Sequence, residues 1–200
     1  MAVVRAGFGS PFGRKARIAI AVLGLEQKVK AEPTQEGNDP VRERNPLGKV
    51  PVMLLDDGDV LFDSPVILEY LDMMAGGGKI LPKEGKARFD ALRLEALADG
   101  ILDAAILQVY EGRYRPAEKH EQKWLDMQAS KVARGLAALE KSPPGLATPP
   151  NVGQITLACA LGYLDFRFQG KWRNDHPRLK AWLDTFAAKV PSFDATKPPG

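Results

Sequence analysis

The chain has 200 residues, which is enough for one large domain or two small ones with a substantial core. Charged residues make up 26% of it and hydrophobic residues 44%, a balance that argues against a disordered chain. The longest apolar runs, residues 18–25 and 155–164, are far shorter than the roughly 20 residues of a membrane-spanning helix. No apolar segment with a small-residue cleavage site marks a signal peptide, so we expect a soluble protein with no membrane partner.

Cysteine and histidine are too few for the metal and disulfide chemistries that depend on them. The single cysteine, Cys159, excludes a disulfide framework and a CxxC motif, which favours a reducing, cytoplasmic setting. His120 and His176 lack the spacing of metal ligands, so we expect no metal. The net charge of +3 comes from 28 basic and 25 acidic residues that are interleaved along the chain, and this distribution argues against nucleic-acid binding.

Strand and helix signals alternate at the start of the chain. Val3 and Val4 open a short strand, residues 18–25 carry apolar side chains at helical spacing, and residues 27–33 fit a second strand. Parallel strands need a crossover connection, so this order predicts a right-handed βαβ unit with its helix on one face of the sheet.

A hairpin and a helix are expected after a polar loop. Residues 50–55 and 60–62 flank the turn Asp56-Asp57-Gly58-Asp59, which is typical of an antiparallel hairpin. Ser64 suits the N-cap of the following helix and Pro65 its first position.

Gly76-Gly77-Gly78 ends that helix and is the candidate domain boundary. We expect a first domain over residues 1–78, a linker over 79–84 and a second domain over 85–200. Beyond the linker only helix signals occur, so the fold class is α/β followed by all-α.

Four helices are expected in the second domain: residues 87–113, a helix beginning at Pro116, one following the proline-rich loop 142–150, and residues 177–189. The third of these begins with Asn151 and Gln154, which match a capping box. It is also the most apolar, so we place it at the centre of the second domain. Cys159 lies on its apolar face, where a small buried core residue is expected.

Three short segments of the first domain carry residues suited to ligand binding, and the expected topology brings them to one edge. In Ser10-Pro11 and Asp63-Ser64-Pro65, a polar side chain begins a helix whose free N–H groups favour an anion, although capping alone also explains both pairs. In Lys49-Val50-Pro51, a cis peptide bond would turn the Val50 backbone outward to pair with an extended ligand. From the sequence this bond is open to either isomer.

In chain order, these segments resemble a known family. The stretches SPFGRKAR at 10–17, NPLGKVPV at 45–52 and DSPVILEYL at 63–71 look like a bacterial glutathione S-transferase of the serine type. The stretch HPRLKAWL at 176–183, followed by Pro191-Ser192-Phe193, is similar to the closing helix of that family. The resemblance covers essentially the whole chain. It implies a thioredoxin-like N-terminal domain of βαβ-ββα order and an all-helical C-terminal domain.

The resemblance also implies roles for individual residues. Ser10 would donate a hydrogen bond to the glutathione sulfur and favour the thiolate. Val50, before a cis Pro51, would pair its backbone with the cysteinyl part, and Lys49 would approach the glycyl carboxylate. Asp63 with Ser64 would hold the γ-glutamyl end. Glutathione would thus be a cosubstrate, with no metal required.

A second substrate would bind between the domains. The residues considered for this pocket are Phe8, Phe12, Tyr110, Arg113 and Tyr114, each of which is also explained as a packing or surface residue. The expected partner is a small hydrophobic electrophile. The resemblance further implies a homodimer.

The function expected from the resemblance is a glutathione transferase acting by conjugation, reductive displacement or glutathione-assisted isomerisation. The alternative is a non-catalytic module on the same fold that binds glutathione or a protein partner. A thioredoxin-like disulfide reductase is disfavoured because no cysteine lies near Ser10.

Overall fold

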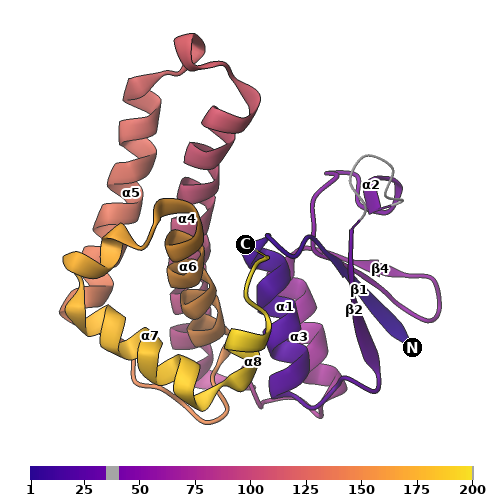
Figure 1. Cartoon of the computed structure of the whole chain (residues 1–200). Coiled ribbons are helices and arrows are strands. Elements are labelled where there is room, and N and C mark those ends of the chain that lie inside the picture. Colours follow the sequence, from indigo (N-terminus) through magenta and orange to yellow (C-terminus); the bar gives the residue numbers. More distant parts are fainter. Residues whose placement is uncertain (35–40, 200) are drawn as a thin grey trace.

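The N-terminal part of the chain is a four-stranded mixed sheet covered on one face by two helices. The computed structural model describes residues 1–34 and 41–199, without the side chains at positions 42 and 43. Its first elements are β1 (Ala2–Ala6), α1 (Pro11–Val22), β2 (Val29–Pro33), α2 (Val41–Arg44), β3 (Val52–Leu54), β4 (Val60–Leu61) and α3 (Ser64–Met74). Helices α1 and α3 lie between the sheet and the helices of the C-terminal part, whereas α2 lies on the side of the strands (Figure 1).

The sheet has the order β2-β1-β3-β4, with β1 and β2 parallel and the other neighbours antiparallel. Central strand β1 alternates buried and half-buried residues, and Val4 is opposite Ala31 on one side and Met53 on the other. This arrangement confirms the expected thioredoxin-like βαβ unit and hairpin. It also places the β1–α1 loop, which contains Ser10, at one end of the sheet.

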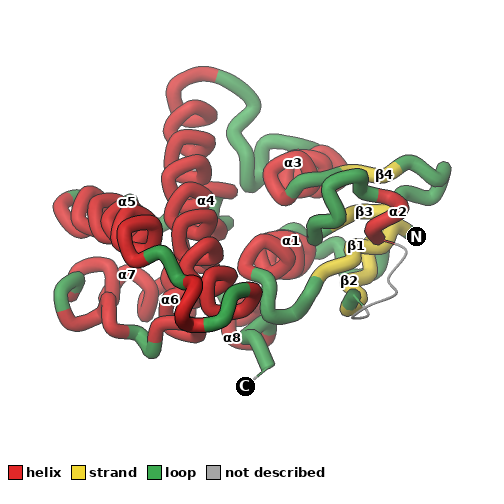
Figure 2. The backbone as a smooth tube through the Cα atoms, turned by 90° about the horizontal axis from the view of Figure 1, so that it is seen from above, coloured by secondary structure: helices red, strands yellow, loops and turns green. Residues whose placement is uncertain are grey.

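The C-terminal part is entirely helical. Its elements are α4 (Gly85–Tyr114), the 3-10 turn η1 (Ala117–Lys119), α5 (Gln122–Lys141), α6 (Val152–Phe168), the 3-10 turn η2 (Lys171–Asn174), α7 (Pro177–Lys189) and α8 (Pro191–Ala195). Helix α6 is buried from Val152 to Leu164 and packs against both α4 and α1. Viewed from above, the helical part lies beside α1 and α3, on the side away from the strands (Figure 2). The burial of α6 and its packing against α4 and α1 confirm its expected position at the centre of the second domain.

Several local predictions are confirmed at the atomic level. The Asn151 side chain accepts a hydrogen bond from the backbone of Gln154, whose own side chain accepts one from the Asn151 backbone, so the capping box is complete. Cys159 is fully buried, and burial raises the pKa of its thiol to about 12. Such a thiol stays protonated at neutral pH, which is consistent with a core role.

Other boundaries differ from the sequence-based expectation. The third helix of the first domain begins one residue earlier than expected, at Ser64, so its N-cap is Asp63. Pro116 starts no α-helix: η1 follows it, and α5 begins only at Gln122. The segment regarded as a polar loop contains the single turn α2, which is too short for a periodic signal. Within the described ranges, no helix is both long enough and apolar enough to cross a bilayer.

Two glycines in long helices are expected to respond oppositely to alanine. A Cβ on Gly153 of α6 would lie 2.6 Å from the Ala91 carbonyl oxygen and 2.7 Å from Leu94 Cβ of α4, so Gly153→Ala should cost about 1–3 kcal/mol. A Cβ on exposed Gly100 of α4 meets nothing within 4 Å. Gly100→Ala should therefore stabilise the protein by up to about 1 kcal/mol through helix propensity. Urea unfolding of both variants tests this; equal effects would contradict the close α4–α6 packing.

Candidate functional site

The β1–α1 loop presents Ser10 at the start of α1. The Ser10 side chain accepts a hydrogen bond of 3.3 Å from the Gly13 backbone N–H. The backbone N–H of Ser10 donates to the Gly7 carbonyl at 2.8 Å. Pro11 occupies the first helical position, as expected for a residue whose missing N–H is not needed there. The hydroxyl keeps its hydrogen, so Ser10 remains able to donate to a ligand at the positive end of the helix dipole.

The same loop meets the segment before β3. A Cβ atom on Gly7 would lie 3.9 Å from both Ser10 Cβ and Val50 Cγ2, so the three residues converge. The Val50-Pro51 peptide bond is cis. Two of the three segments singled out from the sequence are therefore neighbours.

Asn45 organises the turn that leads to Val50. Its side chain is buried, donates to the Lys49 carbonyl at 2.9 Å and accepts from the Leu47 N–H at 3.0 Å. Gly48 closes the turn with a φ of 62°, in the left-handed region that favours glycine. The Lys49 side chain is exposed, and it forms no ion pair within the described ranges.

A cleft of about 110 Å³ brings the second and third segments together. Its lining residues come from α1, the turn before β3, the start of α3 and the middle of α4: Phe12, Asn45, Lys49, Val50, Pro51, Asp63, Ser64, Pro65, Asp99 and Asp103. Asp63 is exposed and its side chain caps no N–H of α3, whereas Ser64 is buried. The Asp63 carboxylate is therefore available to an ammonium group.

The acidic residues of α4 were not anticipated from the sequence. Asp99 and Asp103 are four residues apart and so share one helix face, which turns toward the first domain. Burial raises the pKa of Asp103, Asp63 raises it further, and Lys49 opposes the shift. The i, i+4 spacing of Asp99 and Asp103 could have indicated an acidic helix face. The sequence of α4 alone did not show that this face meets the first domain.

Lys15 of α1 connects the two parts of the molecule beneath this cleft. Its side chain is completely buried, and its ammonium group lies 2.9 Å from both carboxylate oxygens of Asp99 and 3.1 Å from Glu95 Oε1. Burial raises the pKa of Asp99 to about 6, and Lys15 only partly offsets that shift. The cleft therefore rests on an ionic contact between α1 and α4.

The raised pKa of Asp99 predicts a pH dependence of stability. The value of about 6 in the folded protein exceeds the ordinary 3.8, so the folded state binds the extra proton between these limits. The resulting stability is fully present below about pH 3.8 and is lost as the pH rises through about 6. The unfolding free energy of the wild type should fall relative to Asp99→Asn between pH 4.5 and 7. A difference that stays constant over this range would contradict the assignment.

The residues considered for the second substrate separate into two places. Phe12 lines the cleft described above, and Phe8 lies under the guanidinium of Arg17, 4.2 Å from its ring centroid. Tyr110 and Tyr114 form an edge-to-face pair with centroids 5.2 Å apart and line a different cleft, of about 510 Å³, with Trp124 of α5. Arg113 lies 5.6 Å from the Tyr110 ring centroid.

Comparison with known proteins now identifies the family. The N-terminal domain model of glutathione S-transferases matches residues 9–74, and the C-terminal domain model matches residues 122–185. The GST-like protein YibF of Escherichia coli K12 is 36% identical over 196 residues, covering 96% of each chain. Maleylacetoacetate isomerase of Pseudomonas aeruginosa is 27% identical, covering 92% of this chain and 90% of that protein.

Solved structures agree with these matches. A glutathione transferase family member from Pseudomonas fluorescens Pf-5, with bound glutathione, has 41% identity and a TM-score of 0.93 over the full length of both chains. A second structure of that protein, with bound S-(propanoic acid)-glutathione, has 42% identity and a TM-score of 0.88, again over both full chains. The thioredoxin-like and all-helical parts described above are thus shared along the whole chain. The protein belongs to the glutathione S-transferase family.

Proposed function

We propose that the protein is a glutathione transferase of the serine type, which binds glutathione in the cleft beside Ser10 and directs its thiolate at a small electrophile. The observation that carries this proposal is that the β1–α1 loop lies against Val50, and that Val50 and Pro51 line one cleft together with the start of α3. The 41% identical neighbour with bound glutathione supports the choice of ligand.

Each end of glutathione has a complementary group in the cleft. The Val50 backbone, which lines the cleft, pairs with the cysteinyl amide, and Lys49 binds the glycyl carboxylate. Asp63 receives the γ-glutamyl ammonium, while Ser64 and the free N–H groups at the start of α3 receive its carboxylate. Asp103 adds negative charge on the same side as Asp63.

Ser10 acts on the sulfur without losing its own proton. A free thiol has a pKa of about 8.5 and is mostly protonated at neutral pH. A hydroxyl donor and the N-terminal end of α1 both favour the thiolate, and a downward shift of about two pKa units is worth roughly 2.7 kcal/mol. The thiolate then forms the bond to the electrophile. The serine therefore stabilises charge and is not itself the nucleophile.

The reaction is tested by following glutathione consumption with the purified protein. A panel of 1-chloro-2,4-dinitrobenzene, an alkyl halide, an α,β-unsaturated acid and a cis-alkenoic acid separates conjugation, displacement and isomerisation. Saturable, enzyme-dependent turnover of any member supports the proposal. Binding of glutathione with no turnover on the whole panel would instead favour the non-catalytic module.

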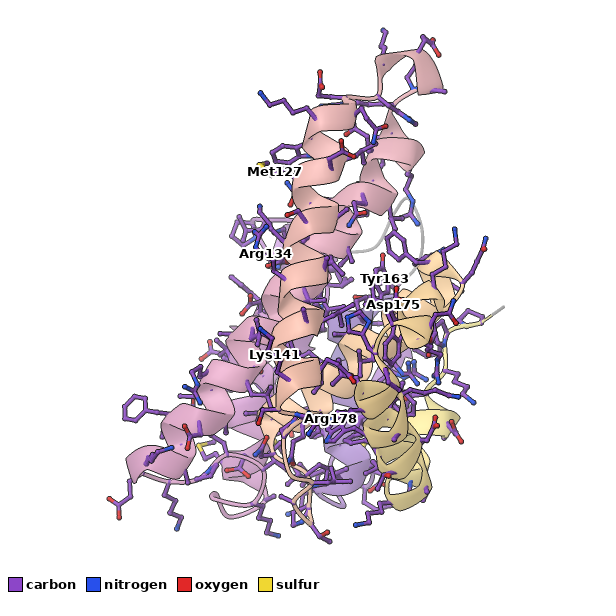
Figure 3. The ribbon with its side chains drawn as sticks, turned by 90° about the vertical axis from the view of Figure 1, so that its left-hand side faces the viewer. Met127, Arg134, Lys141, Tyr163, Asp175 and Arg178 are labelled. Carbon is purple, nitrogen blue, oxygen red and sulfur yellow. The ribbon has the colours of Figure 1, made fainter. Side chains whose placement is uncertain are left out.

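We also propose that the protein is a homodimer. Val66 and Met73 of α3 and Phe89 of α4 are exposed by 46%, 58% and 70%, and the Arg88–Glu69 ion pair holds these helices side by side. An apolar face of this kind is typical of a subunit interface. Light scattering should give twice the chain mass of 21.8 kDa, and Phe89→Glu should lower it to one chain. Met127→Glu on α5 is the matched control (Figure 3); a monomeric wild type would contradict the proposal.

A further inference from the structure

A cationic side chain lies against the backbone immediately before Ser10. A Cβ atom on Gly9 would lie 3.6 Å from Nη2 of Arg167 and 4.0 Å from Cε1 of Phe166, both near the end of α6. Gly9 therefore leaves room for the Arg167 guanidinium beside the loop that carries the serine. This contact is on α6, whereas the cleft assigned to glutathione is lined by α1, α3, α4 and the turn before β3.

Arg167 is held in place by two aromatic neighbours. Its guanidinium lies 4.0 Å from the centroid of the Phe166 ring, and it lies close enough to the Tyr163 hydroxyl to act on it electrostatically. Tyr163 is 5% exposed, and burial raises the pKa of its hydroxyl, so the hydroxyl keeps its proton. Both Arg167 and Tyr163 can therefore donate hydrogen bonds to one anionic group.

The positive charge around this position is not neutralised. Arg113 acts on the Tyr163 hydroxyl electrostatically, and Arg17 lies over the ring of Phe8 in the same loop as Gly9. In the part of the chain that the structure describes, none of these three arginines forms an ion pair. Asp165, the neighbouring acid of α6, is occupied by Arg173 at 2.7 Å and by the Trp172 indole N–H at 2.8 Å.

We propose that the electrophile carries a carboxylate, which Arg167 and the Tyr163 hydroxyl bind beside the glutathione sulfur. This inference deepens the proposed function and rests on it. The two flanks of the Ser10 loop differ in charge, since three carboxylates and Lys49 line the glutathione cleft, whereas Arg167 lies against the loop on the α6 side. The arginine attracts the carboxylate of the second substrate and so orients the electrophile.

A small halo-acid illustrates the balanced reaction. The glutathione thiol loses its proton to solvent, and the thiolate forms a carbon–sulfur bond with the methylene carbon of chloroacetate. The carbon–chlorine bond breaks, and chloride leaves with its electron pair. The carboxylate takes no part in the bond changes, so it serves only as the anchor for Arg167. Chloroacetamide undergoes the same displacement without the charge and is the matched substrate.

The experiment first measures binding, because binding does not depend on turnover. Calorimetric affinities of S-(carboxymethyl)glutathione and S-(carbamoylmethyl)glutathione are compared for the wild type, Arg167→Gln, Arg167→Lys and the control Arg134→Gln. Arg134 lies on α5, which runs in front of α4 in Figure 3, and Tyr163 lies to its right on α6. We expect the wild type and the control to prefer the acid by about tenfold, a preference that Arg167→Gln abolishes and Arg167→Lys partly keeps.

The same variants are then assayed with chloroacetate and chloroacetamide. Arg167→Gln should lower kcat/KM for the acid by about tenfold and leave the amide unchanged, while the affinity for glutathione itself stays at the wild-type value. Equal affinities of the two adducts for a wild type that binds glutathione would overturn this inference alone. Absence of glutathione binding would overturn the proposed function on which it rests.

Discussion

Ser10→Ala is expected to lower glutathione-dependent kcat/KM by about 10- to 100-fold, the loss typical of a hydrogen bond to a charged group. Alanine leaves the N-terminus of α1 and its dipole in place, but it removes the hydroxyl donor that favours the thiolate. The absorbance of bound thiolate, followed against pH, should show the thiol pKa moving back toward its free value. This readout separates loss of charge stabilisation from a general loss of structure.

The variant also removes a helix cap, because the Ser10 side chain accepts from Gly13. That loss should cost about 1 kcal/mol of stability, which most folded domains tolerate. Ser10→Thr keeps a hydroxyl and should retain part of the activity, while Ser130→Ala, at an exposed position of α5, is the control. Unchanged turnover and an unchanged thiol pKa in Ser10→Ala would contradict the assigned role.

Lys15→Met is expected to be the most destabilising of the substitutions considered, at about 3–5 kcal/mol. The Lys15 side chain is completely buried between α1 and α4, and its removal leaves Asp99 and Glu95 without their cation. The Glu95 side chain is only 6% exposed, so water cannot replace the lost charge. Chemical unfolding monitored by circular dichroism measures the effect.

Lys86→Met is the matched control, since the Lys86 side chain is 86% exposed and pairs with Asp90 at the surface. Its effect should stay within about 0.5 kcal/mol. The double variant Lys15→Met with Asp99→Asn should recover part of the loss, because one uncompensated charge is then removed. Strictly additive effects would show that Lys15 and Asp99 are not energetically coupled.

Local chemistry explains which elements were predicted well from the sequence. Proline at a first helical position and an intact capping box are decided by residues a few positions apart, so Pro177–Lys189 and the start of α6 were placed correctly. The β1–β2 crossover followed from alternating strand and helix signals. The three motif segments also identified the family, because their spacing is read directly from the sequence.

The features missed from the sequence depend on contacts between distant residues. Lys15 and Asp99 are 84 positions apart, and neither carries a sign of its buried partner. The sequence analysis did not single out Arg167, and only the packing of Gly9 against α6 places this arginine beside the serine loop. Asn45 was quoted within a motif, but its role in closing the turn required the backbone of Lys49 and Leu47.

The central claim is that the cleft beside Ser10 binds glutathione, and calorimetric titration of glutathione into the purified protein tests it most directly. Because every assigned group in the cleft recognises one part of the tripeptide, we expect saturable binding to one site per chain. Asp63→Ala should weaken that binding, since it removes the acceptor for the ammonium group. No detectable heat up to millimolar glutathione, repeated at a second temperature, would contradict the account and indicate a fold that serves another ligand or partner.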